Sequence, residues 1–152
     1  MKEFRIRPIE PKDYGQWKPL WDGYNSFYGR SGETALSEAV TQATWQSFFD
    51  DSEPVFGAVA ESADTVVGIV HYLFHRSTNQ LNSVCYLHDL YTDESVRGLG
   101  IGKQLIGAVY DHARSLGAPS VHWHTHHTNS TAMRLYDQVA TNSGFVVYKA
   151  LL

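Results

Sequence analysis

The chain has 152 residues, of which 43% are hydrophobic, and it carries a formal net charge of −4 at pH 7. A chain of this length can bury one hydrophobic core, so we expect residues 1–152 to form a single domain. The negative charge argues against a nucleic-acid partner, because neutralising phosphates requires a basic face, and fits a small cationic substrate better. No apolar run reaches the ~20 residues of a membrane span, and the first residues lack the apolar core of a signal peptide. These features predict a cytoplasmic protein without a membrane partner.

The N-terminal half of the sequence predicts one strand, two helices and a β-hairpin. The strands are expected from alternating or β-branched segments and the helices from apolar residues at helical spacing. Their ranges are 4–9 for the strand, 17–28 and 34–49 for the helices, and 55–61 with 65–76 for the hairpin. Pro19 is expected to kink or split the first helix.

The C-terminal half continues with strand, helix, strand, helix and strand. The predicted strands cover 83–92, 120–127 and 145–152, and a helix ended by Gly117 follows the first of them. Asn129 or Ser130 can cap the last helix. The complete order predicts a mixed α/β fold with a right-handed crossover between the strands at 83–92 and 120–127. Cys85, the only cysteine, lies in an apolar run and is expected to be a packed thiol.

A glycine-rich turn, "RGLGIG", joins the predicted strand at 83–92 to its helix. Gly98, Gly100 and Gly102 have no side chain to block a ligand, so successive backbone amides can face one anion at the start of the helix. Arg97 and Lys103 can pair with phosphate from the sides. The turn lacks the Gly-Lys-Ser/Thr ending of a phosphate-binding loop and the spacing of a dinucleotide fingerprint. A bare turn that only tightens the corner is the alternative.

The turn resembles the Arg/Gln-x-x-Gly-x-Gly/Ala signature of the GNAT superfamily of N-acetyltransferases, whose loop binds the pyrophosphate of acetyl-coenzyme A. The resemblance extends over 84–148. It implies the GNAT acyl-CoA N-acyltransferase fold, in which helices flank a mixed, mostly antiparallel sheet with splayed central strands. It also implies direct transfer of the acetyl group from acetyl-CoA to an amine, without a metal. The Leu-x-Asp run before the loop is similar to the diamine acetyltransferases, which implies a small amine acceptor, and the family often forms homodimers through its closing strands.

The resemblance further implies particular coenzyme contacts. A bulge around Leu90, Tyr91 and Thr92 would splay the strand and leave the Leu90 amide free to bond the thioester oxygen. Tyr136 falls at the position of the tyrosine that protonates the coenzyme A thiolate and is our candidate for that acid, with a core aromatic as the alternative. The full implied set is Leu90, Tyr91, Thr92, Arg97, Gly98, Leu99, Gly100, Ile101, Gly102, Lys103, Asn129, Ala132 and Tyr136. Seven residues separate Tyr136 from Gly144, more than in relatives, so the helix is expected to continue by another turn.

The acceptor side departs from the diamine enzymes, because His88 stands where they have a glutamate base. A histidine can take the amine proton near neutral pH, so His88 is a candidate base or water-positioning residue, with a structural role as the alternative. Adjacent strand residues face opposite sides, so His88 and Asp89 are not expected to line the slot together. The predicted substrate contacts are Tyr24, Tyr28, His88, Asp89, Trp123 and His124.

The run "HWHTHH" places His122, His124 and His126 on one strand face, where three imidazoles could bind zinc. Alternate strand residues lie ~6.5–7 Å apart, which is too far for one ion without a bend, so no metal site is expected. Other hypotheses remain open at this point. The acceptor could be a protein N-terminus or lysine, the chain could be a non-catalytic CoA-binding module, or the histidines could make it a metal-binding protein.

Overall fold

The computed structural model of the chain describes residues 3–152. Its elements follow the predicted order except at the C-terminus. They are β1 (Arg5–Pro8), α1 (Tyr14–Phe27), α2 (Glu38–Ser47), β2 (Val55–Ser62), β3 (Thr65–His75), β4 (Val84–Thr92), α3 (Ile101–Ser115), β5 (Val121–His122) and α4 (Ser130–Val139). Single 3-10 turns at Pro11–Asp13, Gly32–Thr34 and Glu94–Val96 link some of them.

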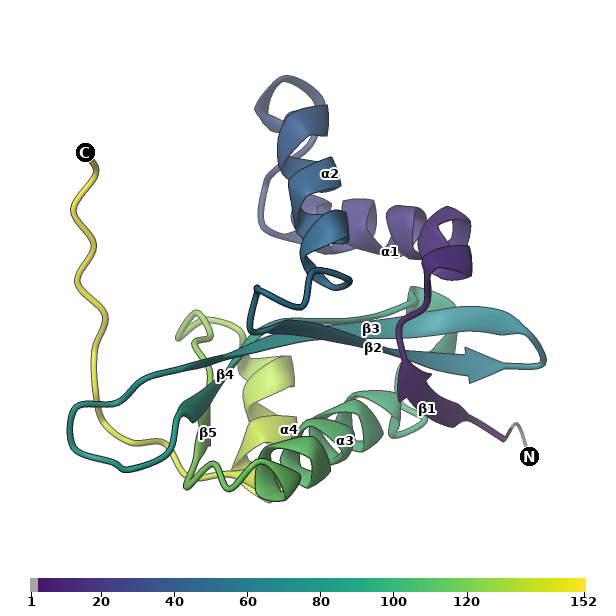
Figure 1. Cartoon of the computed structure of the whole chain (residues 1–152). Coiled ribbons are helices and arrows are strands. Elements are labelled where there is room, and N and C mark those ends of the chain that lie inside the picture. Colours follow the sequence, from purple (N-terminus) through teal and green to yellow (C-terminus); the bar gives the residue numbers. More distant parts are fainter. Residues whose placement is uncertain (1–2) are drawn as a thin grey trace.

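The strands form one sheet in the order β1-β2-β3-β4-β5. The first three pairings are antiparallel, whereas β4 and β5 are parallel and are joined through α3. Helices α1 and α2 lie on one side of the sheet, and α3 and α4 lie on the other (Figure 1). The structure therefore confirms a mixed, mostly antiparallel sheet flanked by helices.

Helix α1 continues through Pro19, so it is not split there. A proline removes the hydrogen bond to the carbonyl four residues earlier and its ring crowds that carbonyl, but the residue concerned, Gly15, lies in the first turn of the helix. The apolar face of α1 stabilises the helix more strongly than one lost bond weakens it, since Trp17, Leu20 and Trp21 are all buried against the sheet.

Two hydrophobic cores lie on the two faces of the sheet. The first packs α3, through Leu105 and Val109, against β2–β4, and the second packs α1 against Val59 and Ile69. Cys85 is 0% exposed within the first core, as expected for a packed thiol, and burial raises its pKa to about 11. The sheet is thus anchored on both faces around the centre of β3 and β4.

The predicted closing strand at 145–152 is not formed. Residues 140–152 contain neither helix nor strand, and the side chains of Phe145 and Tyr148 are 91% and 93% exposed. Figure 1 shows this segment running away from the sheet and helices. An apolar segment needs a neighbouring edge to pair with before it can form a strand, and β5 contributes only Val121 and His122 to the sheet. Among residues 3–152, no helix has the length and apolar character required to span a membrane.

Candidate active site

The glycine-rich turn leaves an open space at the start of α3. Gly98 and Gly100 both adopt left-handed backbone angles, with φ of 80° and 81°. Gly100 is the N-cap of α3 and provides no side-chain cap for the first amides of the helix. A Cβ added at either glycine would have no heavy atom within 4 Å. Uncapped helix amides beside open space form a site that fits an anion such as a pyrophosphate.

The other loop residues divide between solvent and core. Leu99 is exposed, whereas Ile101 is buried in the core, so Ile101 can offer only its backbone amide to a coenzyme. A Cβ on Gly102 would lie 3.2 Å from Leu135, so this glycine allows α3 to pack closely against α4. The predicted contacts at Ile101 and Gly102 are therefore possible through the backbone alone.

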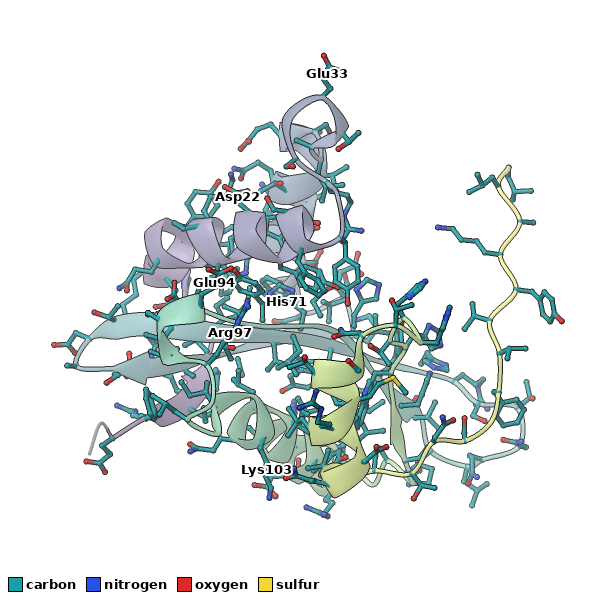
Figure 2. All side chains as sticks on the ribbon, turned by 180° about the vertical axis from the view of Figure 1, so that it is seen from behind. Asp22, Glu33, His71, Glu94, Arg97 and Lys103 are labelled. Carbon is teal, nitrogen blue, oxygen red and sulfur yellow. The ribbon has the colours of Figure 1, made fainter. Side chains whose placement is uncertain are left out.

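The two cations near the loop differ in how they are held. The Nε of Arg97 donates to the Thr92 carbonyl at 3.3 Å, and its guanidinium lies 5.3 Å from the centre of the Tyr91 ring. Lys103 is exposed and projects from α3 on the side away from the sheet (Figure 2). Tyr91 itself packs against Gly23 of α1, where an added Cβ would meet its hydroxyl at 2.6 Å. Arg97 is thus held beside the residues that precede the loop, and its Nη1 also lies 3.9 Å from the Glu94 carboxylate.

Strands β4 and β5 separate beyond their first two paired residues. β5 pairs only with Cys85 and Tyr86, so the edge of β4 that faces β5 is unpaired from Leu87 onward. The Asp93 amide donates to β3 at Val67. Because amide directions alternate along a strand, the amides of Leu90 and Thr92 point to the unpaired edge. The expected splay is present and leaves the Leu90 amide available to a ligand.

The bulge in β4 lies earlier than predicted. His71 pairs with Asp89 while the adjacent Tyr72 pairs with Leu87, which makes His88 the extra residue. A bulge turns consecutive side chains out of strict alternation. The Nδ1 of His88 consequently lies 2.9 Å from the Asp89 carboxylate, and the expectation that these two side chains face opposite sides is wrong.

A chain of buried hydrogen bonds supports His88 from behind. Trp17 Nε1 donates to His71 Nε2 at 2.9 Å, and His71 Nδ1 lies 2.9 Å from the second oxygen of Asp89. The indole N–H can only donate, so His71 must accept at Nε2 and carry its proton on Nδ1, facing Asp89. Figure 2 shows His71 between α1 and the sheet. The network thereby specifies an ionised Asp89 that accepts from both histidines.

The hydrogen bonds around Asp89 shift the pKa values of Asp89 and His88. Burial opposes ionisation of Asp89, but the hydrogen bonds from His71 and His88 outweigh it and hold the pKa of Asp89 below its usual range. The bond to Asp89 raises the pKa of His88 in turn. The His88 side chain is 55% exposed, and it borders a cavity of about 160 Å³ together with His71 and Asp89. With Nδ1 directed to Asp89, the Nε2 of His88 is left to act on a ligand.

Tyr136 lies on α4, across the separated strands from the first helix. Its ring packs against Trp123 at 5.4 Å between centres, and within residues 3–152 its hydroxyl makes no hydrogen bond that the structure records. Burial raises the pKa of Tyr136 to about 12, so the phenol carries its proton at neutral pH. Asn129 caps α4 by accepting from the Ala132 amide at 3.4 Å, which leaves its side-chain NH₂ available to a coenzyme.

The predicted acceptor residues fall into two groups. Tyr24 and Tyr28 lie together with ring centres 5.1 Å apart, and burial together with Asp89 raises the pKa of both. His124 lies beside β4, where its Nδ1 is 3.2 Å from the Tyr86 hydroxyl. Trp123 packs on Tyr136 and thus contributes to the core side of the slot.

The histidine run does not form a strand as long as predicted. β5 ends at His122, and His126 bonds locally to Thr128. Among residues 3–152, no three histidine, cysteine or acidic side chains are arranged to hold a metal ion.

Sequence reasoning missed Trp17 and His71, which complete the network behind His88. One signal was present, because His71 is the only residue in the apolar stretch "VVGIVHYLF" of β3 whose side chain ordinarily titrates near neutral pH. A polar side chain in the middle of a fully buried strand requires a partner. The identity of that partner depends on how α1 packs across the sheet.

The site can be compared with known proteins. Residues 17–140 match the model of the acetyltransferase (GNAT) family. The D-amino-acid N-acetyltransferase HPA3 of Saccharomyces cerevisiae is 37% identical over 146 residues, which cover 95% of this chain and 88% of that protein. The uncharacterized N-acetyltransferase YhfO of Bacillus subtilis is 28% identical and covers 94% of each chain.

Solved structures agree on the fold. Aminoglycoside N-acetyltransferase AAC(6')-Iy with a bisubstrate analogue superposes with a TM-score of 0.83 at 16% identity, over 99% of each chain. The same enzyme in complex with CoA gives a TM-score of 0.80 at 17% identity, over 99% of this chain and 96% of that one. With the glycine turn, the separated strands and these relatives in agreement, the chain belongs to the acetyltransferase (GNAT) family and is an N-acetyltransferase.

Proposed function

We propose that the protein transfers the acetyl group of acetyl-CoA directly to the primary amine of a small, amino-acid-like molecule. The observation that carries the proposal is the placement of His88, backed by Asp89, at the bulge of β4, close in sequence and space to the open Leu90 amide. HPA3 is named for D-amino acids, which supports this kind of acceptor. A polyamine, suggested by the Leu-x-Asp run, has no such support from the relatives.

The coenzyme is held mainly by backbone groups. Gly98 and Gly100 leave the first amides of α3 open to the pyrophosphate, and Arg97 adds a nearby positive charge. Bound acetyl-CoA supplies an activated thioester. The Leu90 N–H donates to the thioester oxygen and stabilises the negative charge that develops on it. Holding both reactants in the slot also contributes several kcal/mol of the rate enhancement through proximity.

Two side chains move protons. His88 Nε2 accepts the amine proton, directly or through a water, and Asp89 stabilises the resulting imidazolium. Tyr136 donates its phenolic proton to the departing thiolate. No covalent bond to the enzyme is required. The unpaired, half-buried hydroxyl of Tyr136 argues against a non-catalytic CoA-binding module, because a purely packing aromatic needs no oxygen.

An acceptor screen tests the proposal. The protein with acetyl-CoA would be assayed against D- and L-amino acids, polyamines, aminoglycosides and peptides. We expect the highest kcat/KM for a free amino acid. Acetylation of peptide N-termini or lysines alone would move the acceptor class to proteins, and coenzyme binding without any transfer would reduce the protein to a CoA-binding module.

We also propose that the protein forms a homodimer through 145–152, in which this segment pairs with a second copy. Its apolar side chains are exposed in the single chain, namely Phe145, Val146, Val147, Tyr148, Leu151 and Leu152. Light scattering should give twice the chain mass for the full protein and the single-chain mass once residues 145–152 are removed. A monomeric full-length protein would contradict this.

The cytoplasmic location stays a prediction.

A further inference from the structure

Arg30 is held at the end of α1 by a buried asparagine. Gly29 turns the chain with a φ of 76°, and the Arg30 amide then donates to the Asn25 carbonyl at 2.9 Å. The Arg30 Nε donates to the Asn25 side-chain oxygen at 2.7 Å, while the Asn25 amide group donates to the Trp21 carbonyl at 2.9 Å. Asn25 is only 4% exposed. Both the backbone and the guanidinium of Arg30 are thereby fixed in one orientation.

The outer nitrogens of the Arg30 guanidinium remain available. Across residues 3–152, the structure records no carboxylate within ion-pair distance of Arg30 and no bond from its two terminal nitrogens. Arg7 shows the contrast, because both of its terminal nitrogens bond to Asp13 at 2.8 Å. Arg30 also borders a cavity of about 310 Å³ between α1 and α2, so a small molecule can reach it from that side; this cavity shares no lining residue with the one that His88 and Asp89 border. A fixed guanidinium with two free N–H donors is suited to a carboxylate.

Arg30 belongs to the acceptor side of the site. Its guanidinium carbon lies 5.8 Å from the centre of the Tyr24 ring and 5.4 Å from that of Tyr28. Besides burial, Asp89 raises the pKa of both tyrosines, and Arg30 opposes that effect. Arg30 likewise opposes the increase in the pKa of His88 that Asp89 causes. The guanidinium thus lies beside two of the predicted acceptor tyrosines, on the side of the site where Asp89 acts on them.

We propose that Arg30 binds the carboxylate of the acceptor and so selects a free amino acid, whose amine lies at His88. The inference rests on the proposed function. A zwitterion matches the charges of the site, since its ammonium faces the Asp89–His88 pair and its carboxylate faces the guanidinium. A diamine would instead place its second ammonium beside Arg30, and like charges repel. The same residue thus explains why the acceptor would be an amino acid and not a polyamine.

The test compares an amino acid accepted by the wild-type enzyme with its carboxamide and its decarboxylated amine. We expect the wild type to prefer the acid by at least about tenfold in kcat/KM. Arg30→Met replaces the guanidinium by a shorter, uncharged and unbranched side chain, and it should lower kcat/KM for the acid by roughly 10- to 100-fold, mainly through KM, with little change for the amide and amine. Arg30→Lys should recover part of the loss. Arg114→Met, which removes an exposed arginine on α3, serves as the control and should leave all three values unchanged.

The outcomes separate this inference from the function beneath it. A smaller ratio of kcat/KM for the acid to kcat/KM for the amide, measured in a folded Arg30→Met protein, supports the carboxylate site. An equal loss on all three acceptors, or an unchanged ratio, would overturn the role of Arg30 while leaving N-acetylation intact. An absence of transfer to any amine by the wild type would overturn the proposed function and this inference together.

Discussion

The coenzyme half and the acceptor half of the site are built in opposite ways. The part of the coenzyme half that would hold the pyrophosphate comes from one contiguous stretch, 97–103, where the glycines leave open space and the ligand would meet backbone amides. The acceptor half joins side chains from α1, β3 and β4, in which Trp17, His71 and Asp89 are buried and bonded to one another. A local turn can be recognised from its sequence, whereas a tertiary network depends on how distant elements pack.

The two halves should also respond differently to substitution. Changes at Gly98 or Gly100 should alter coenzyme binding without disturbing the fold, because an added Cβ there would meet no heavy atom within 4 Å. Changes in the acceptor half should alter chemistry and stability together, because its side chains serve both. Four substitutions test this difference.

Tyr136→Phe is expected to have the largest effect. It removes the proposed proton donor but keeps the ring against Trp123, so turnover should fall by roughly 10²- to 10⁴-fold while coenzyme affinity changes little. Steady-state kinetics and calorimetry measure the two quantities. The control is Tyr110→Phe, which removes a hydroxyl that bonds to the Val139 carbonyl at 2.8 Å and should cost stability without affecting turnover. Near-normal turnover in Tyr136→Phe would remove the tyrosine from the mechanism.

Gly100→Asp should weaken coenzyme binding by about 100-fold, since it puts a carboxylate where the pyrophosphate would lie. Gly100→Asn is the matched control, because asparagine has the same shape and also tolerates a positive φ but carries no charge. Calorimetric titration with acetyl-CoA compares the pair. Equal affinities for the two variants would show that no anion binds at this loop.

Asp89→Asn should change the pH dependence of turnover. The carboxylate raises the pKa of His88, so the base of the wild-type enzyme becomes neutral only as the pH rises through that raised value. Without the carboxylate the pKa of His88 falls, and the acidic limb of the kcat profile should move to lower pH. Turnover on the plateau should drop by roughly tenfold or more, because the imidazolium loses its counter-charge. An acidic limb at the wild-type position would argue against His88 as the base.

The same substitution has a consequence for stability. Because the pKa of Asp89 is depressed in the folded protein, its ionisation stabilises the fold above about pH 4, and this contribution is lost as the pH falls further. Urea unfolding at several acidic pH values should therefore show a smaller pH dependence in Asp89→Asn than in the wild type. If the free energy of unfolding depends on pH equally in Asp89→Asn and in the wild type, the Asp89 carboxylate is not selectively stabilised by its histidine partners.

Trp17→Phe should have the smallest effect on chemistry. The ring is largely retained, but His71 Nε2 becomes a buried acceptor without a donor, which costs about 1–3 kcal/mol of the free energy of unfolding. Trp21→Phe is the control, because its indole bonds to the Thr41 hydroxyl at 3.2 Å, and a hydroxyl can turn to another partner. Urea unfolding gives both values. If Trp17→Phe lowers the free energy of unfolding by no more than Trp21→Phe does, the hydrogen bond to His71 contributes no more to stability than the one to Thr41.

Most of the fold could be predicted because its signals are local. The hairpin of β2 and β3, the crossover through α3 and the loop at 97–103 each depend on nearby residues and were found where expected. The predicted closing strand at 145–152 was not found, because an apolar segment can pair as a strand only where a neighbouring edge is present, and the segment's own residues do not reveal that edge.

The acceptor side was predicted less completely for a physical reason. Nothing in the sequence reveals that β4 gains an extra residue at His88, since the bulge is defined only by the register with β3. Strict alternation of strand side chains therefore predicted that His88 and Asp89 face opposite sides, although the two side chains lie within hydrogen-bond distance. The contacts of Arg30 and His71 likewise depend on the position of α1 over the sheet, which no local pattern determines.

The burial of Cys85 has a practical consequence for every assay above. It is the only thiol in the chain, and with 0% exposure and a pKa of about 11 it is neither accessible nor ionised at the pH of a typical measurement. Only thiolates react rapidly with disulfide reagents. A chromogenic reagent such as an aromatic disulfide should therefore leave the folded enzyme untouched and report coenzyme A continuously as it is released, with the native protein contributing no background colour.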